Sequence, residues 1–76
     1  MKAIVYSTSS CVWCDNVVRI LKDKDIEVEK IDVGADPNQL KEMLKVSNKQ
    51  KTVPQVVIDG EFIGGFTETE RFLNHL

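Results

Sequence analysis

Two cysteines, Cys11 and Cys14, stand only three positions apart and are the only cysteines of the chain. A structural disulfide stabilises a fold mainly by closing a long loop of the unfolded chain, and a loop this short constrains almost nothing. A stabilising role is therefore the weaker interpretation. The C-x-x-C spacing indicates instead a pair of thiols used in redox chemistry, or half of a metal-ligand set.

The composition places these thiols in one small domain that spans residues 1–76. The net charge is −2 and no basic block occurs, which argues against nucleic acid as a main partner. No apolar run approaches the length of about 18 residues that spans a membrane. The first residues lead straight into a strand pattern rather than a signal peptide. We therefore expect a soluble, cytoplasmic monomer.

Hydrophobic periodicity predicts seven elements in the order β-α-β-α-β-β-α. Short apolar runs predict four strands: residues 2–7, 26–33, 55–58 and 61–63. The helix signals are an apolar face on Cys14, Val17, Val18 and Leu21; Asp36-Pro37 before Leu40, Met43 and Leu44; and a capping box of Thr67 and Glu70 before Phe72, Leu73 and Leu76. Right-handed crossovers then give a four-stranded mixed sheet flanked by three helices, which is the thioredoxin-like α/β fold.

The two cysteines occupy different positions on the first predicted helix. Cys11 lies at or next to the helix start, where free N–H groups and the helix dipole favour a thiolate. Cys14 lies one turn further on, on the apolar face, and should be shielded from solvent. We therefore predict that Cys11 attacks a disulfide and that Cys14 resolves the resulting mixed disulfide. Trp13 can be a packed core aromatic or an exposed platform, and its place opposite the apolar face favours the platform.

Three other segments have both an ordinary and a functional interpretation. Pro54 alone would be read as a trans proline at the start of an edge strand. Residues 64–68, G-G-F-T-E, can be a plain turn from strand to helix. The glycines would also let a ligand approach the backbone, and the helix start would bind a carboxylate. The charged residues between Lys41 and Lys51 are interpreted as a solvated face, with docking of acidic proteins as the less favoured alternative.

Three motifs, C-V-W-C at 11–14, T-V-P-Q at 52–55 and I-G-G-F at 63–66, resemble those of glutaredoxins across essentially the whole chain. The stretch C-V-W-C-D-N is most similar to short phage-encoded members. The resemblance implies a dithiol enzyme that reduces protein disulfides and glutathione mixed disulfides, with glutathione as electron donor. It also implies a cis bond before Pro54, so that Val53 offers its backbone N–H and C=O to the cysteine moiety of glutathione.

The same resemblance places the two carboxylates of glutathione. The γ-glutamyl carboxylate would lie at the start of the last helix, and the glycyl carboxylate would need a cation, for which Lys41 or Lys51 is available. The implied glutathione contacts are Trp13, Thr52, Val53, Pro54, Gly65, Phe66, Thr67, Glu68, Lys41 and Lys51. Ribonucleotide reductase is implied as a client protein by the resemblance alone.

The chain departs from the commonest glutaredoxin pattern beside its cysteines. Val12 and Trp13 stand where Pro and Tyr are usual, and Thr8 stands where a Lys is frequent. The missing Lys leaves open a glutaredoxin-like redoxin that is recharged by thioredoxin reductase. The missing Pro leaves open a [2Fe–2S] cluster shared between two chains, with glutathione thiols as further ligands. Otherwise no bound metal is expected, and His75 is interpreted as an exposed charge partner near a helix end.

Overall fold

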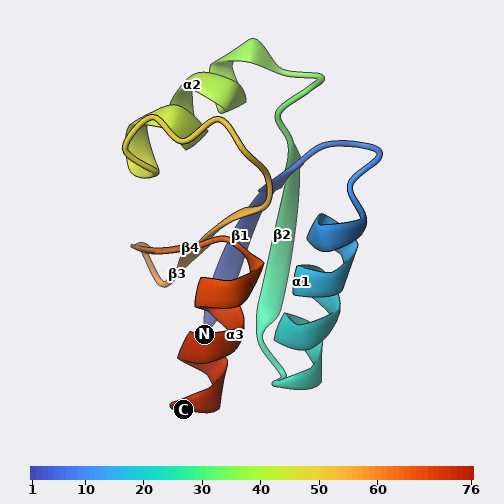
Figure 1. The fold of residues 1–76 in the computed structure, drawn as a ribbon, viewed down its shortest axis with the longest axis vertical. Helices are drawn as coiled ribbons and strands as arrows, with labels where there is room; N and C mark the ends of the chain where they lie inside the picture. Colours follow the sequence, from blue (N-terminus) through green and yellow to red (C-terminus); the bar gives the residue numbers. More distant parts are fainter.

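A mixed sheet in the order β2-β1-β3-β4 forms the centre of the computed structural model, which describes residues 1–76. The elements are β1 (Lys2–Ser7), α1 (Val12–Asp23), β2 (Glu27–Asp32), α2 (Pro37–Val46), β3 (Gln55–Ile58), β4 (Glu61–Gly64) and α3 (Phe66–Asn74). β1 runs parallel to β2 and antiparallel to β3, and β3 runs antiparallel to β4. This four-stranded sheet with three helices is the thioredoxin-like fold, as predicted (Figure 1).

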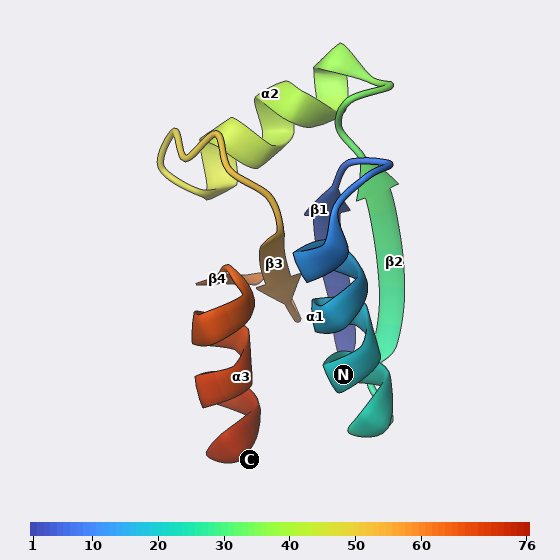
Figure 2. The ribbon, with the colours of Figure 1, turned by 45° about the vertical axis from the view of Figure 1, so that its right-hand side comes forward.

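The two faces of the sheet bury separate hydrophobic clusters. α1 and α3 pack against each other and cover one face, where the buried side chains are Ala3, Val5, Val17, Leu21, Ile26, Val56, Ile58 and Leu73. α2 covers the other face, where its own Met43 is buried with Tyr6, Val33 and Val57. Neighbouring residues of one strand serve opposite clusters because successive side chains of a strand alternate. Figure 2 shows α2 lying across the end of the sheet at which α1 begins.

β2 is an edge strand and is shorter than its apolar pattern predicted. Ile26 and Val33, predicted as its end residues, are buried but lie outside the strand. Within it, Val28 packs against the first cluster and Ile31 against the second, because side chains three positions apart point to opposite faces. The strand therefore contributes one side chain to each face.

The C-terminal helix also ends earlier than predicted. α3 stops at Asn74, and Leu76, expected on its apolar face, is 63% exposed. That expectation was wrong, because the last residues lie beyond the helix and cannot continue its apolar stripe. None of the three helices combines the length and the apolar character needed to cross a bilayer.

Candidate active site

The cysteine pair sits where β1 passes into α1. Cys11 is the N-cap residue of α1, with extended backbone angles, and its Sγ accepts the backbone N–H of Cys14 at 3.1 Å. The two sulfurs form a disulfide across a Cα–Cα distance of 5.2 Å. Cys11 is partly exposed, whereas Cys14 is fully buried. A partner molecule can therefore reach Cys11 but not Cys14, which is the asymmetry that the helix position predicted.

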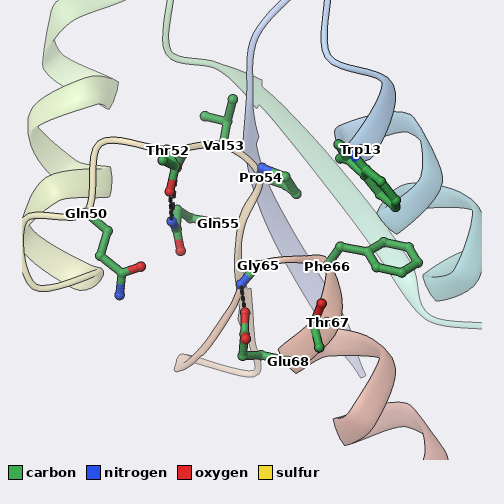
Figure 3. A pocket seen from close by; sticks show the side chains of 10 residues that line it. All are labelled: Trp13, Gln50, Thr52, Val53, Pro54, Gln55, Gly65, Phe66, Thr67 and Glu68. Atoms are coloured by element: carbon green, nitrogen blue, oxygen red, sulfur yellow. Dashed lines mark hydrogen bonds between the residues drawn. The ribbon is translucent and has the colours of Figure 1, made fainter.

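A pocket of about 400 Å³ opens beside this turn, and three separate segments build it. α1 contributes Trp13, the loop before β3 and the first residue of β3 contribute Gln50 and Thr52–Gln55, and the start of α3 contributes Gly65–Glu68 (Figure 3). Eight of the predicted glutathione contacts therefore line one cavity: Trp13, Thr52, Val53, Pro54, Gly65, Phe66, Thr67 and Glu68. The cysteines themselves are not among the lining residues; Trp13 connects their turn to the pocket.

The loop before β3 presents free backbone groups to this pocket. The Val53–Pro54 peptide bond is cis, and the N–H and C=O of Val53 take no part in the backbone hydrogen bonds of the protein. The side chain of Gln55 fixes Thr52, the residue before Val53. Its Nε2 donates to the carbonyl oxygen of Thr52 at 2.9 Å and to Thr52 Oγ1 at 3.2 Å. Gln55 is 2% exposed, so a buried amide fixes the loop while Val53 keeps an unused donor and acceptor.

The start of α3 forms the opposite wall of the pocket. The predicted capping box of Thr67 and Glu70 was wrong: Gly65 is the N-cap, and Glu68 Oε1 accepts its N–H at 2.9 Å. The helix begins earlier because Gly64, at φ 129°, turns the chain sharply out of β4. The first N–H groups of a helix have no partner within it. Those of residues 66–68 are therefore available to an anion in the pocket.

An aromatic pair joins the two sides of the site. Trp13 is 58% exposed, and its ring centroid lies 5.1 Å from that of Phe66, with the ring planes tilted by 59°. This is a favourable geometry for aromatic contact. The prediction that Trp13 is exposed is confirmed, and its interpretation as a core aromatic was wrong. The pair links the cysteine turn to the first residue of α3.

The pocket contains a carboxylate but no cation. Glu68 is the only charged residue among the ten that line it. Lys41 and Lys51, predicted as partners of a glycyl carboxylate, instead line a separate groove with Leu44, Lys45 and Lys49. Sequence reasoning missed Gln50 and Gln55. Gln55 stands within the T-V-P-Q motif and could have been included, whereas nothing in the polar loop marks Gln50.

The metal-binding alternatives find little support in the side chains. No group of three or more His, Cys, Asp or Glu residues gathers anywhere in the chain. An iron–sulfur cluster is held by four ligands, so this chain would supply Cys11 and the buried Cys14 and the rest would come from outside. A cluster shared between two chains, with glutathione thiols as further ligands, stays a prediction that the side chains of one chain do not test. His75 is exposed at the end of α3, where its Nδ1 lies 2.7 Å from the carbonyl oxygen of Arg71.

A C-x-x-C disulfide at a helix start, opposite a cis-proline loop in a thioredoxin-like sheet, defines a thiol–disulfide oxidoreductase. A sequence model of the glutaredoxin family matches residues 3–63. The chain belongs to the glutaredoxin family.

Individual relatives agree with this assignment. An uncharacterized glutaredoxin-like 8.6 kDa protein of Clostridium pasteurianum is 39% identical over 66 residues, which cover 87% of either chain. Other curated relatives are longer, and the chain covers 43% to 62% of their length.

Two solved structures show the same fold at lower identity. A buckwheat glutaredoxin in complex with glutathione is 23% identical, with a TM-score of 0.79 over 96% of this chain and 69% of that one. The glutaredoxin-like NrdH-redoxin of Escherichia coli is 24% identical, with a TM-score of 0.76 over 100% of this chain and 95% of that one. The fold therefore accommodates a glutathione-bound protein and a redoxin equally well, and the site residues must distinguish them.

Proposed function

We propose that this protein uses glutathione to reduce protein disulfides and glutathione mixed disulfides, with Cys11 as nucleophile and Cys14 as resolving thiol. One observation carries the proposal. The pocket beside Cys11 offers an unpaired backbone N–H and C=O at Val53 on one wall and free helix N–H groups on the other. A tripeptide thiol that carries carboxylates can use both features, the first to bind its backbone and the second to bind one carboxylate.

Glutathione fits the pocket in one orientation. Its cysteine residue pairs with the Val53 backbone as an added strand would, which directs its sulfur toward Cys11. The γ-glutamyl carboxylate then lies at the start of α3, where the dipole and the free N–H groups stabilise an anion. The glycyl carboxylate lies toward Gln50, whose exposed amide is a donor, with Lys51 as the next residue. The buckwheat relative with bound glutathione supports the choice of ligand.

The chemistry is a two-electron exchange in which every sulfur is accounted for. The Cys11 thiolate attacks one sulfur of a client disulfide, forms a mixed disulfide and releases the other client sulfur as thiolate. The Cys14 thiolate then attacks Cys11 Sγ, which forms the Cys11–Cys14 disulfide and releases the second client thiolate. One glutathione thiolate attacks Cys11 Sγ, which forms a mixed disulfide between glutathione and Cys11 and releases the Cys14 thiolate. A second attacks the bound glutathionyl sulfur, which yields oxidised glutathione and restores the Cys11 thiolate.

The helix start assists this cycle chiefly by making Cys11 a good leaving group. A free thiol of pKa about 8.5 is only a few per cent ionised at neutral pH, so full ionisation gains roughly 30-fold in thiolate. Nucleophilicity falls with a Brønsted slope of about 0.4–0.5, and a pKa lowered by about three units loses roughly the same factor. The attack rate therefore changes little. Departure of Cys11 from its mixed disulfides becomes faster, because a thiol of lower pKa leaves faster.

The test is turnover of a small glutathionyl mixed disulfide, coupled to glutathione reductase and NADPH. We expect activity in the wild type, none in Cys11→Ser, and retained activity in Cys14→Ser, since glutathione itself can attack the Cys11 adduct. Loss of activity in Cys14→Ser as well would show that the second thiol is obligatory for such substrates. An inactive wild type would refute the glutathione assignment.

A redoxin recharged by thioredoxin reductase is the second candidate, and the missing cation favours it. Glutathione has two carboxylates, yet no Lys or Arg lines the pocket, and Thr8 stands where glutaredoxins frequently carry Lys. The similarity to NrdH-redoxin is consistent with this use of the same fold. Recovery of activity only when thioredoxin reductase replaces glutathione and its reductase would establish this candidate.

The proposed activity also suggests client proteins and a cellular compartment. The dithiol site suits protein disulfides in the cytoplasm, where thiols are kept reduced, and ribonucleotide reductase is one client to test. On the C-V-W-C-D-N segment we propose the short phage-encoded type as the subgroup. A panel of oxidised client proteins, each treated with reduced wild type and with Cys11→Ser, would identify which disulfides are reduced by Cys11.

A further inference from the structure

A second groove, about 400 Å³ in volume, runs along α2 and the loop after it. Leu44 and four lysines line it: Lys41, Lys45, Lys49 and Lys51. All four lysines are exposed, and the ion pairs of the protein are formed elsewhere, between Lys2 and Glu29 and between Lys30 and Asp15. Residues 41–51 hold these four lysines against one glutamate, Glu42, in a chain whose net charge is −2. We call this surface the lysine groove.

The loop that carries half of the lysine groove is held in an unusual conformation. Asn48 and Lys49 are consecutive left-handed residues, with φ of 58° and 67°. Side chains disfavour this conformation, and it persists only where the surrounding structure imposes it. Here the buried Ser47 donates its hydroxyl to the carbonyl oxygen of Gln50 at 3.2 Å, and the N–H of Lys49 donates to the carbonyl oxygen of Leu44 at 2.7 Å. Lys49 is thereby fixed beside α2.

The same loop borders the redox pocket. Gln50 lines the pocket, while its two neighbours, Lys49 and Lys51, line the lysine groove. In Figure 3 the loop passes from α2 through Gln50 and Thr52 to Val53 and Pro54. A client whose disulfide is at Cys11 and whose chain lies along Val53 therefore has the lysine groove beside it, on the same loop.

We propose that the lysine groove docks an acidic segment of the client protein, next to the disulfide that Cys11 reduces. This inference rests on the proposed reduction of protein disulfides. Charge complementarity identifies the occupant: four unpaired ammonium groups surround a floor formed by Leu44 and the aliphatic lysine stems. Such a surface fits Asp or Glu side chains interspersed with an apolar residue.

Other anions fit the surface less well. The groove has no aromatic side chain on which a nucleotide base could stack. The net charge of −2 also disfavours binding of a long nucleic acid. All four lysines are exposed point charges, which attract an extended acidic chain without forming a closed cage for a small anion. An acidic peptide is the occupant that uses both the charges and the apolar floor.

The test is a single-turnover reduction that needs no glutathione. Pre-reduced protein is mixed with a synthetic peptide that contains one disulfide, followed by a segment of Asp, Glu and Leu. The control peptide has Asn and Gln in place of Asp and Glu. Acid quenching and chromatography give the second-order rate constant for each peptide. We expect the wild type to reduce the acidic peptide about tenfold faster than the amide peptide at low salt, with the ratio falling as salt rises.

Two double variants assign the effect to the lysine groove. Lys45→Glu/Lys49→Glu should abolish the preference and leave reduction of the amide peptide unchanged, because neither lysine is among the glutathione or pocket residues. Lys22→Glu/Lys24→Glu makes the same change in net charge at the far end of α1 and should retain most of the preference (Figure 2).

The outcomes separate the docking proposal from the function. Equal rates for the two peptides in the wild type would overturn the docking proposal while upholding disulfide reduction. An equal loss of preference in both double variants would also overturn it, since overall charge would then be the cause. Two competitors test the kind of occupant: a single-stranded oligonucleotide and an acidic peptide without a disulfide. If both inhibit reduction of the acidic peptide equally, the groove is not specific for a protein segment. Failure to reduce either peptide would refute the proposed function itself.

Discussion

Replacing Gly64 with alanine should destabilise the protein by more than any other single methyl group added at a glycine. Gly64 has φ 129°, a backbone region essentially reserved for glycine, and occupying it with another residue costs about 1–3 kcal/mol. The added Cβ would also lie 2.9 Å from Cβ and Cγ of Glu68. Because that Cβ is attached directly to the α3 backbone, no rotation of the Glu68 side chain can relieve the contact.

To relieve the contact between the added methyl group and Glu68, α3 would have to move away from Gly64. This movement has a second consequence. It would pull the Glu68 carboxylate away from the N–H of Gly65, and loss of a helix cap costs about 1 kcal/mol. Together the two effects remove about 2–4 kcal/mol. A domain of 76 residues has about 4–11 kcal/mol in total at typical values per residue. Urea unfolding followed by circular dichroism would measure the loss directly.

Two other glycines provide matched controls. At Gly60, with φ 83° and nothing within 4 Å of a Cβ, alanine adds backbone strain alone, about 1–2 kcal/mol. At Gly65 the backbone is ordinary, and the nearest atom to a Cβ is the movable Glu68 Oε1 at 3.2 Å. Gly65→Ala should therefore fold almost normally while its methyl group obstructs the pocket and raises KM for glutathionyl substrates. Equal stabilities of Gly64→Ala and Gly60→Ala would refute the reasoning about α3.

Three further predictions follow from the core and the pocket rim. Leu21→Ala removes a fully buried side chain and should cost about 2–5 kcal/mol in urea unfolding, with Val18→Ala, at a partly buried position, as a milder control. Burial, and then the charges of Glu42 and Glu29, raise the pKa of Tyr6. Its stabilising contribution is therefore complete below the unfolded pKa of about 10 and is lost as pH rises through the folded value. Unfolding experiments between pH 8 and pH 11 should show a steeper loss in the wild type than in Tyr6→Phe; parallel losses would contradict this. Because Trp13 is 58% exposed, Trp13→Ala should cost less than Leu21→Ala in urea unfolding, of which about 0.5–1.5 kcal/mol comes from the aromatic contact with Phe66, yet it should raise KM for a glutathionyl substrate. An unchanged KM would show that the ring does not contact the ligand.

Most of the site could be predicted from the sequence because its signals are local. A C-x-x-C spacing at a helix start fixes which sulfur accepts an N–H and which is buried, and the structure places Cys11 and Cys14 accordingly. The resemblance to glutaredoxins likewise named eight residues of the pocket, six of them within the three motifs. These predictions depend on single turns of the chain, where the residues that act together are also close together in the sequence.

The errors arose where neighbouring segments decide the geometry. The start of α3 was predicted from a Thr-x-x-Glu pattern, but the positive φ of Gly64 lets the helix begin at Phe66 and makes Glu68 the capping partner. Lys41 and Lys51, chosen by residue type as partners of the glycyl carboxylate, line the lysine groove and not the pocket, so their contact with glutathione stays a prediction. The contribution of Gln50 to the pocket depends on the left-handed loop at Asn48 and Lys49, which no local pattern predicted.

Mass spectrometry of a trapped intermediate tests the central proposal most directly. Reduced Cys14→Ser is incubated with oxidised glutathione, quenched with acid and digested, beside Cys11→Ser treated identically. If Cys11 is the nucleophile and the pocket holds glutathione, Cys14→Ser should gain the mass of one glutathionyl group on Cys11. Cys11→Ser should gain none, because Cys14 is fully buried. An adduct on Cys14 of the Cys11→Ser protein at a comparable rate, or no adduct on Cys11, would contradict the assignment of Cys11 and its pocket.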